Sequence, residues 1–107
     1  MKRLRFVKPL PKQILRGEKS ITWRIDDEKG ITVGDVLSLQ HTDNKEFARA
    51  KVLWVKDTTF ENLTGEDKEG HEEYASDEEM YKLYSKWYNM KVTPKTKLKV
   101  IRFKLLP

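Results

Sequence analysis

Hydrophobic and polar side chains alternate along several short stretches of the chain, as they do along strands that bury one face. Between Ser20 and Ile25, Ile21 and Trp23 fall on one face and polar side chains fall on the other. The longest stretch of this kind ends at Val55. We predict strands over Arg3–Val7, Ser20–Ile25, Phe47–Val55 and Lys97–Leu105, and within Ile31–Leu39 a turn at Gly34–Asp35 that leads into a further strand.

One long helix is predicted after Ser76. Ser76 and Glu79 match a capping box, a pattern that begins many helices because the two residues satisfy each other's backbone N–H groups. Apolar residues then recur at the i, i+3, i+4, i+7 spacing of a single helix face, namely Met80, Leu83, Tyr84 and Trp87. This face should close one end of the hydrophobic core.

Shorter helical segments are predicted earlier in the chain. A helix of about two turns should begin near Pro9 and Pro11 and end at Gly17, because proline fits the first turn and glycine the residue after the last. Its inward-facing residues are predicted to be Leu10, Ile14 and Leu15. A turn or short helix is predicted over 60–63, and an acidic surface loop over Gly65–Tyr74.

Together these elements indicate an α+β fold. About five to six short strands with two or three helices, lacking the regular alternation of strand and helix found in parallel sheets, favour a small barrel or curled sheet. The chain of 107 residues has the usual size of one domain, and no linker-like stretch divides it. We therefore expect a single domain over residues 1–107.

Charge is unevenly distributed along the chain, whose net charge is +5. Residues 1–24 carry eight basic side chains and one acidic, and residues 81–107 carry eight and none. Residues 57–80 instead carry one basic and ten acidic side chains. A basic chain with one acidic insertion suits a polyanionic partner on one face. Solvated lysines on the outer faces of strands would produce the same pattern, so both interpretations stay open.

The composition of the chain bears on its stability, on metal and cofactor sites and on membrane association. Charged residues make up 36% of the chain, a profile typical of heat-stable proteins, so we expect thermal stability. The chain has no cysteine, and His41 and His71 belong to no spaced metal motif, so we expect neither a metal nor a cofactor. No apolar run approaches the roughly 20 residues that span a bilayer. We expect a cytoplasmic protein without a membrane partner, and a monomer.

The stretch GEKSITWR, from Gly17 to Arg24, is the strongest candidate for a site. It places the amine of Lys19, the hydroxyl of Thr22 and the fixed cation of Arg24 within one strand length. A lysine acts as a base only if its pKa lies well below about 10, which burial or a neighbouring guanidinium can achieve. Thr22 could then be a nucleophile, with a proton supplied from the later acidic loop. An exposed strand face without chemistry has the same composition, and pattern alone favours it.

Several segments, taken in order, match a known domain. ILRGEKSITWR, VGDVLSL, FARAKVLWV, FENLT, EGH and VIRFKL follow one another between Leu4 and Leu105. In this order they resemble the ASCH domain, a member of the PUA-like superfamily. The most specific element is the GxKxxTxR pattern, formed by Gly17, Lys19, Thr22 and Arg24. The resemblance implies a β pseudobarrel with flanking helices, whose cleft is lined by this motif and binds RNA or a modified nucleoside or nucleotide.

The resemblance also implies an alternative, catalytic function. Small single-domain ASCH proteins similar to this chain are 4-acetylcytidine amidohydrolases, in which a lysine, a threonine and a loop glutamate are the proposed catalytic set. Lys19 and Thr22 match the first two. Matching the segment EGH selects Glu69 as the glutamate, whereas counting back from the following helix selects Glu73. In this scheme Thr22 attacks the acetyl carbonyl after Lys19 takes its proton, and the glutamate protonates the leaving amine.

Overall fold

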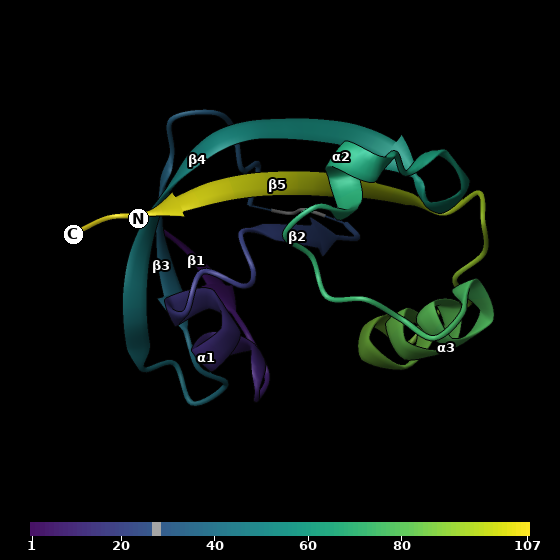
Figure 1. Ribbon diagram of the computed structural model, residues 1–107, viewed down its shortest axis with the longest axis horizontal. Coiled ribbons are helices and arrows are strands. Elements are labelled where there is room, and N and C mark those ends of the chain that lie inside the picture. The colour runs from purple at the N-terminus through teal and green to yellow at the C-terminus, as the bar shows by residue number, and fades with distance from the viewer. Residues whose placement is uncertain (27–28) are drawn as a thin grey trace.

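The computed structural model describes residues 1–26 and 29–107 (Figure 1). Within these residues five strands form one curled sheet: β1 (Lys2–Arg5), β2 (Ile21–Arg24), β3 (Val36–Gln40), β4 (Glu46–Thr59) and β5 (Lys97–Leu105). The strand order is β1-β3-β4-β5-β2, with β1 parallel to β3 and the other neighbours antiparallel. With its helices, this mixed sheet confirms the predicted α+β pseudobarrel class.

Strand β4 causes the curl of the sheet, because it pairs with different neighbours along its length. Its first part pairs with β3 up to Lys51, and from Ala50 to its end it pairs with β5. The pairing with β5 shifts register between Val52 and Trp54, an irregularity of the kind that increases local twist. The strand runs on to Thr59, four residues beyond the predicted end, and bends sharply where the two pairings meet (Figure 1).

Two hydrophobic clusters fill the inside of the curled sheet. Helix α1 (Leu10–Leu15) contributes Ile14 to the first, which includes Leu37 and Ile101. Helix α3 (Asp77–Tyr88) contributes Met80 and Tyr84 to the second. The two helices therefore lie at separate ends of the sheet, and strand β2 passes between them (Figure 1).

Helix α1 is shorter than predicted and buries a different set of residues. Pro11 and Ile14 are buried, whereas Leu15 is 55% exposed, so the prediction that Leu15 faces inward is wrong. Pro11 and Ile14 are three positions apart and therefore share one helix face, whereas Leu15 lies about 100° further round the helix axis. Gly17 follows the helix with a φ of 80°, a left-handed conformation that glycine adopts without strain.

Helix α3 begins as predicted and differs at its end. The Ser76 side chain accepts a hydrogen bond of 3.2 Å from the Glu79 backbone N–H, as half of the predicted capping box. Met80 and Tyr84 are buried, but Trp87 is 46% exposed, which contradicts its predicted place in the core. Trp87 borders a cavity instead, although Tyr84 before it and Tyr88 after it pack in the second cluster. Among the described residues, no helix is both long and apolar enough to cross a membrane.

The acidic segment 65–74 is only in part the surface loop that was predicted, because it begins with a short helix (α2, Gly65–Lys68). The 3-10 turn before it (η1, Phe60–Asn62) confirms the turn or short helix predicted over 60–63. Helix α2 is capped by Thr64, and Asp67 is 1% exposed and accepts a 2.8 Å bond from Lys56 Nζ. The Trp23 indole N–H donates to the Asp67 carbonyl oxygen at 3.0 Å. These contacts attach the segment to β2 and β4, so charge alone does not decide where an acidic segment lies.

Candidate functional site

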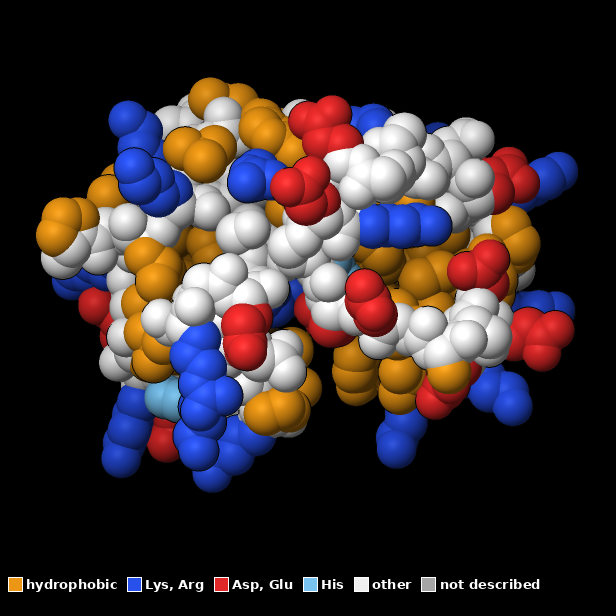
Figure 2. Space-filling view, in the orientation of Figure 1, with side chains coloured by type: hydrophobic (Ala, Val, Ile, Leu, Met, Phe, Trp, Pro, Cys, Tyr) orange, Lys and Arg blue, Asp and Glu red, His pale blue; other side chains and the backbone are white. Residues whose placement is uncertain are grey.

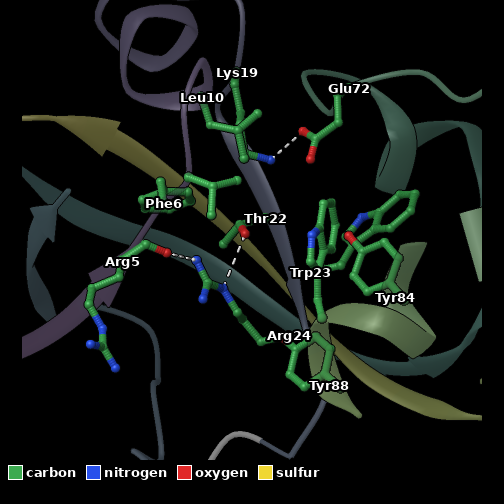
Figure 3. Close-up of a pocket in the computed structure, with 12 residues that line it drawn as sticks. Arg5, Phe6, Leu10, Lys19, Thr22, Trp23, Arg24, Glu72, Tyr84 and Tyr88 are labelled. Atoms are coloured by element: carbon green, nitrogen blue, oxygen red, sulfur yellow. Dashed lines mark hydrogen bonds and ion pairs between the residues drawn. The ribbon is translucent and has the colours of Figure 1, made fainter. Parts of the chain in front are cut away.

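A cavity of about 310 Å³ lies between the β1–α1 region and helix α3 (Figure 3). Strand β2 and the segment after α2 complete its wall. The residues that line it are Arg5, Phe6, Val7, Leu10, Lys19, Thr22, Trp23, Arg24, Glu72, Tyr84, Trp87 and Tyr88. Lys19, Thr22 and Arg24 of the GxKxxTxR motif are thus brought together in one cavity.

Lys19 is a buried cation in the wall of this cavity. Its side chain is 2% exposed, and its Nζ donates to the Ile21 carbonyl oxygen at 2.7 Å and to Glu72 Oε2 at 2.6 Å. Burial lowers the pKa of Lys19 from 10.5 to about 8; the Glu72 carboxylate acts in the opposite direction, and the Arg24 charge adds slightly to the lowering. A tenth or so of the Lys19 amines are therefore neutral at pH 7.

Glu72 is the carboxylate partner of Lys19. Burial acts to raise the pKa of Glu72, but the charge of Lys19 and its hydrogen bond outweigh burial, and the pKa lies below its ordinary value. The Tyr74 hydroxyl also donates to Glu72 Oε1, at 3.4 Å. At neutral pH the pair is therefore mainly ionic, with a negative carboxylate beside a positive amine.

The glutamates expected from the sequence, Glu69 and Glu73, do not hold this position. Both are exposed, and the structure brings Glu72 to Lys19 instead. Gly70, with a φ of 81°, turns the chain so that the residues after it run along the start of β2. Nothing in the local sequence distinguishes Glu72 from Glu69 and Glu73. The turn at Gly70 therefore decides which glutamate pairs with Lys19.

Thr22 and Arg24 form the opposite side of the polar wall. Thr22 is 4% exposed, and its Oγ1 accepts a 3.3 Å hydrogen bond from Arg24 Nε. Arg24 also donates to the Arg5 carbonyl oxygen at 3.1 Å, and its guanidinium lies 4.8 Å from the centre of the Phe6 ring (Figure 3). Arg24 thereby ties β2 to β1 and orients the Thr22 hydroxyl.

Gly17 does not line the cavity, although the sequence placed it among the binding residues. It lies at the end of α1 and borders a different hollow, beside the end of β5. Its backbone N–H donates to the Ile14 carbonyl oxygen at 3.0 Å. Its contribution is to turn the chain so that Lys19 enters the cavity two residues later.

Sequence reasoning missed the aromatic part of the site. Trp23, Tyr84, Trp87 and Tyr88 all border the cavity, and the buried ring of His71 stacks on Trp23 with centroids 3.7 Å apart. Helical spacing assigned both Tyr84 and Trp87 to the core, because a stripe at that spacing does not distinguish core from cavity; Tyr84 is indeed in the core and also borders the cavity, whereas Trp87 only borders the cavity. The segment EGH did contain His71, which the structure buries at 7% exposure.

The cavity combines aromatic walls with side chains that can act as acid and base. Aromatic rings can hold a planar ligand, and Lys19 with Glu72 can donate, accept or move a proton. Within residues 1–26 and 29–107, no cluster of three or more histidine, aspartate or glutamate side chains is placed to hold a metal ion.

Comparisons with known proteins find likeness in structure only. No family model and no curated protein matches the sequence. The ASCH domain from Lactobacillus crispatus JV V101 aligns with a TM-score of 0.67 and 18% identity over 89% of this chain and 69% of that one. Hypothetical protein PH0355 aligns with a TM-score of 0.74 and 25% identity over 99% and 100%.

A third solved structure, protein EF3133 from Enterococcus faecalis V583, is described by the family model DUF984. It aligns with a TM-score of 0.75 and 14% identity over 91% of this chain and 69% of that one. The chain therefore has the fold of the solved ASCH domain structure, a curled α+β barrel.

Proposed function

We propose that the cavity binds a modified nucleoside or nucleotide, either free or within an RNA strand. One observation carries the proposal: aromatic side chains and five polar or charged ones, Arg5, Lys19, Thr22, Arg24 and Glu72, enclose a space of about 310 Å³. Ligand pockets typically measure about 300–1,000 Å³ and combine apolar walls with a few placed polar groups. The volume suits one small ring-containing ligand.

The lining groups match the chemistry of a nucleobase. Trp87 and Tyr88 supply aromatic surface, on which any base can stack because every base has a π-face. Lys19 and Glu72 supply a donor and an acceptor, the pair that an exocyclic amide requires. The exposed cation Arg5 at the edge of the cavity suits a phosphate.

Tryptophan fluorescence tests binding, because Trp23 and Trp87 line the cavity and Trp54 does not. We expect saturable changes with 4-acetylcytidine or with a short RNA that contains it, and a weaker response with cytidine. RNA affinity should fall as salt rises, whereas affinity for the uncharged nucleoside should not. A Trp54→Phe variant should keep the response. Absence of a saturable response to all three probes would contradict the proposal.

A Trp87→Ala variant measures the contribution of the aromatic wall. Stacking of a base on an aromatic side chain contributes about 1–3 kcal/mol, so affinity should fall about 5- to 150-fold. Trp87→Phe should restore most of it. Because Trp87 is 46% exposed, the substitution should leave the thermal unfolding midpoint almost unchanged. Equal affinity of wild type and Trp87→Ala would show that the ligand does not contact this wall.

A second function, hydrolysis of 4-acetylcytidine, is favoured by the Lys19–Glu72 pair. A buried lysine whose pKa lies near 8, within hydrogen-bonding distance of a carboxylate and in the same cavity as a buried threonine, is an arrangement common at catalytic sites. A donor and an acceptor that only bind a neutral base need no lowered lysine pKa, whereas a base catalyst does. This proposal keeps the Lys19 and Thr22 roles expected from the sequence and assigns the proton-donor role to Glu72.

The proposed reaction proceeds in two steps that return Lys19, Thr22 and Glu72 to their starting protonation states. Neutral Lys19 takes the Thr22 proton while Oγ1 bonds the acetyl carbon; the carbon–nitrogen bond then breaks, and the proton passes through Glu72 to the leaving nitrogen. Water next attacks the acetyl-threonine: Lys19 takes one water proton and returns it to Thr22 Oγ1 as the ester bond breaks, and the acetic acid released loses its remaining proton to solvent as acetate. In the resting structure Lys19 Nζ bonds Ile21 and Glu72 rather than Thr22, so the first transfer needs a rotation of the lysine or one bridging water.

Turnover of 4-acetylcytidine to cytidine and acetate, followed by chromatography, tests this reaction. Lys19→Ala, Thr22→Val and Glu72→Gln should each lower the rate by about 100-fold or more, because general acid-base groups contribute about 10²–10⁴-fold. Glu69→Gln and Glu73→Gln are the matched controls, since both side chains are exposed, and should stay within about twofold of wild type. Full activity of Thr22→Val would exclude the acyl-enzyme route.

A further inference from the structure

His71 is a buried titratable residue that the proposed chemistry does not use. Its side chain is 1% exposed, and its ring lies parallel to the Trp23 indole, with an interplanar angle of 10° and centroids 3.7 Å apart. The charged groups around it are Lys19, Glu72 and Arg24. Burial, followed by the charge of Lys19, lowers the pKa of His71 to about 4, so the ring is neutral at pH 7.

The hydrogen bonds of a neutral ring define where its proton lies. Nδ1 is 3.0 Å from the Glu72 carbonyl oxygen, which can only accept, so Nδ1 carries the proton. Nε2 must then accept, and the Tyr84 hydroxyl lies 3.4 Å away. Burial raises the pKa of Tyr84 well above its ordinary value, so this hydroxyl keeps its proton and can donate. The chain of bonds runs from Tyr84 through His71 to Glu72.

His71 Nδ1 lies close to Glu72 at two places. Besides the carbonyl, Nδ1 lies 3.5 Å from Glu72 Oε2, the oxygen that Lys19 Nζ reaches at 2.6 Å. The preceding residue, Gly70, is attached to β2, because its carbonyl oxygen accepts from the Ser20 and Ile21 backbone N–H groups at 2.8 and 3.2 Å. The backbone on both sides of His71 is therefore held.

We infer that His71 is a positioning residue, whose Nδ1–H fixes Glu72 so that its carboxylate meets Lys19. A ring that only filled space between Trp23 and Tyr84 could be replaced by phenylalanine, which stacks equally well but donates nothing. Asparagine has no ring to stack, but its amide nitrogen can donate the hydrogen bond in place of Nδ1. The inference rests on the proposed function for its role in the chemistry, while its test follows Lys19 without any ligand.

The experiment measures the pKa of Lys19 by NMR on protein carrying ¹³C-labelled lysine, with the Lys19 signal identified by its loss in Lys19→Met. Glu72→Gln removes a carboxylate that raises the pKa of Lys19, so this pKa should fall by about one unit or more. His71→Phe should lower it in the same direction, and His71→Asn should leave it near 8. In a Glu72→Gln background, His71→Phe should cause no further fall.

Controls separate positioning from packing. His41→Phe applies the same change to the other histidine, which packs on Phe47 far from the motif in sequence, and should leave the pKa of Lys19 unchanged. If the His71→Phe variant does not fold, the pKa of Lys19 is measured in a His71→Met variant instead. The inference is overturned if the pKa of Lys19 is unchanged or rises in the apolar variant, or if it moves equally in the Glu72→Gln background. Failure of nucleosides to bind would instead contradict only the proposed function.

Discussion

Lys19 is the residue on which the proposed chemistry most depends. A lysine amine that remains charged at neutral pH is a poor base, and burial corrects this by bringing the pKa of Lys19 to about 8. Glu72 limits the fall, because a carboxylate at 2.6 Å favours the charged amine. The two residues thus act against each other, and their balance sets the fraction of amine that can accept a proton.

The hydrolysis of 4-acetylcytidine should therefore depend on pH through Lys19. Since the neutral amine is the active form, kcat/KM should rise about tenfold per pH unit below 8 and level off above it. The Glu72→Asp variant keeps a carboxylate but holds it farther from Lys19, so the pH at which the profile levels off should be lower. A profile that bends near 10.5, or a break that stays in place in Glu72→Asp, would show that Lys19 is not the titrating base.

At the scale of elements, the segment between α2 and α3 determines whether the site forms. Asp67 holds one end of it to β4 through Lys56, and Gly70 holds its middle to β2. A Cβ on Gly70 would lie 2.4 Å from Ser20 Oγ, and the φ of 81° is unfavourable for any other residue. Gly70 is therefore the position at which this segment tolerates substitution least.

Replacing Gly70 with alanine should loosen this attachment. We expect Gly70→Ala to lower the free energy of unfolding by about 1–2 kcal/mol, the cost of a left-handed conformation, since Ser20 can rotate its hydroxyl away. Gly65→Ala is the control, because nothing lies within 4 Å of its Cβ and it occupies a helical position in α2. Urea titration measures both. Equal stabilities of the two variants would show that the close approach at Gly70 is unimportant.

At the scale of the whole molecule, the curled sheet brings together regions that are distant in sequence. Residues of β1 and of α3 lie across one cavity only because β4 pairs with β3 at one end and β5 at the other. Acidic side chains lie over α2 and the segment that follows, while Lys and Arg side chains gather around α1 on the same face (Figure 2). Uneven charge along the chain thus becomes uneven charge over the surface.

High charge content leads to an expectation for the whole molecule. With charged residues at 36% and partly buried pairs such as Lys56–Asp67, the unfolding midpoint should lie above the roughly 45–65 °C of ordinary mesophile domains. Calorimetry at 0.05 and 1 M NaCl measures it, and the midpoint should fall at the higher salt as surface pairs are screened. A midpoint inside the mesophile range would contradict the expectation.

Local pattern alone was sufficient for much of the fold. Alternation along 20–25 and 97–105 and the cap at Ser76 predicted elements that the structure contains, because side-chain period and capping depend on neighbours in sequence. The same holds for Lys19, Thr22 and Arg24, since residues so close along one stretch enter the cavity together. Leu15 and Trp87 were assigned to the core wrongly, because periodicity reports a shared face and not what covers it.

The tertiary structure alone decided which residues complete the site. Glu72 reaches Lys19 across 53 positions of sequence, and neither its type nor its spacing distinguishes it from Glu69 or Glu73. The choice depends on Gly70, whose turn and attachment to β2 direct His71 onto Trp23 and Glu72 into the cavity. The amino-acid sequence thus determined the local chemistry of the motif, while long-range packing selected its partner, because only packing sets distances between segments that are remote in sequence.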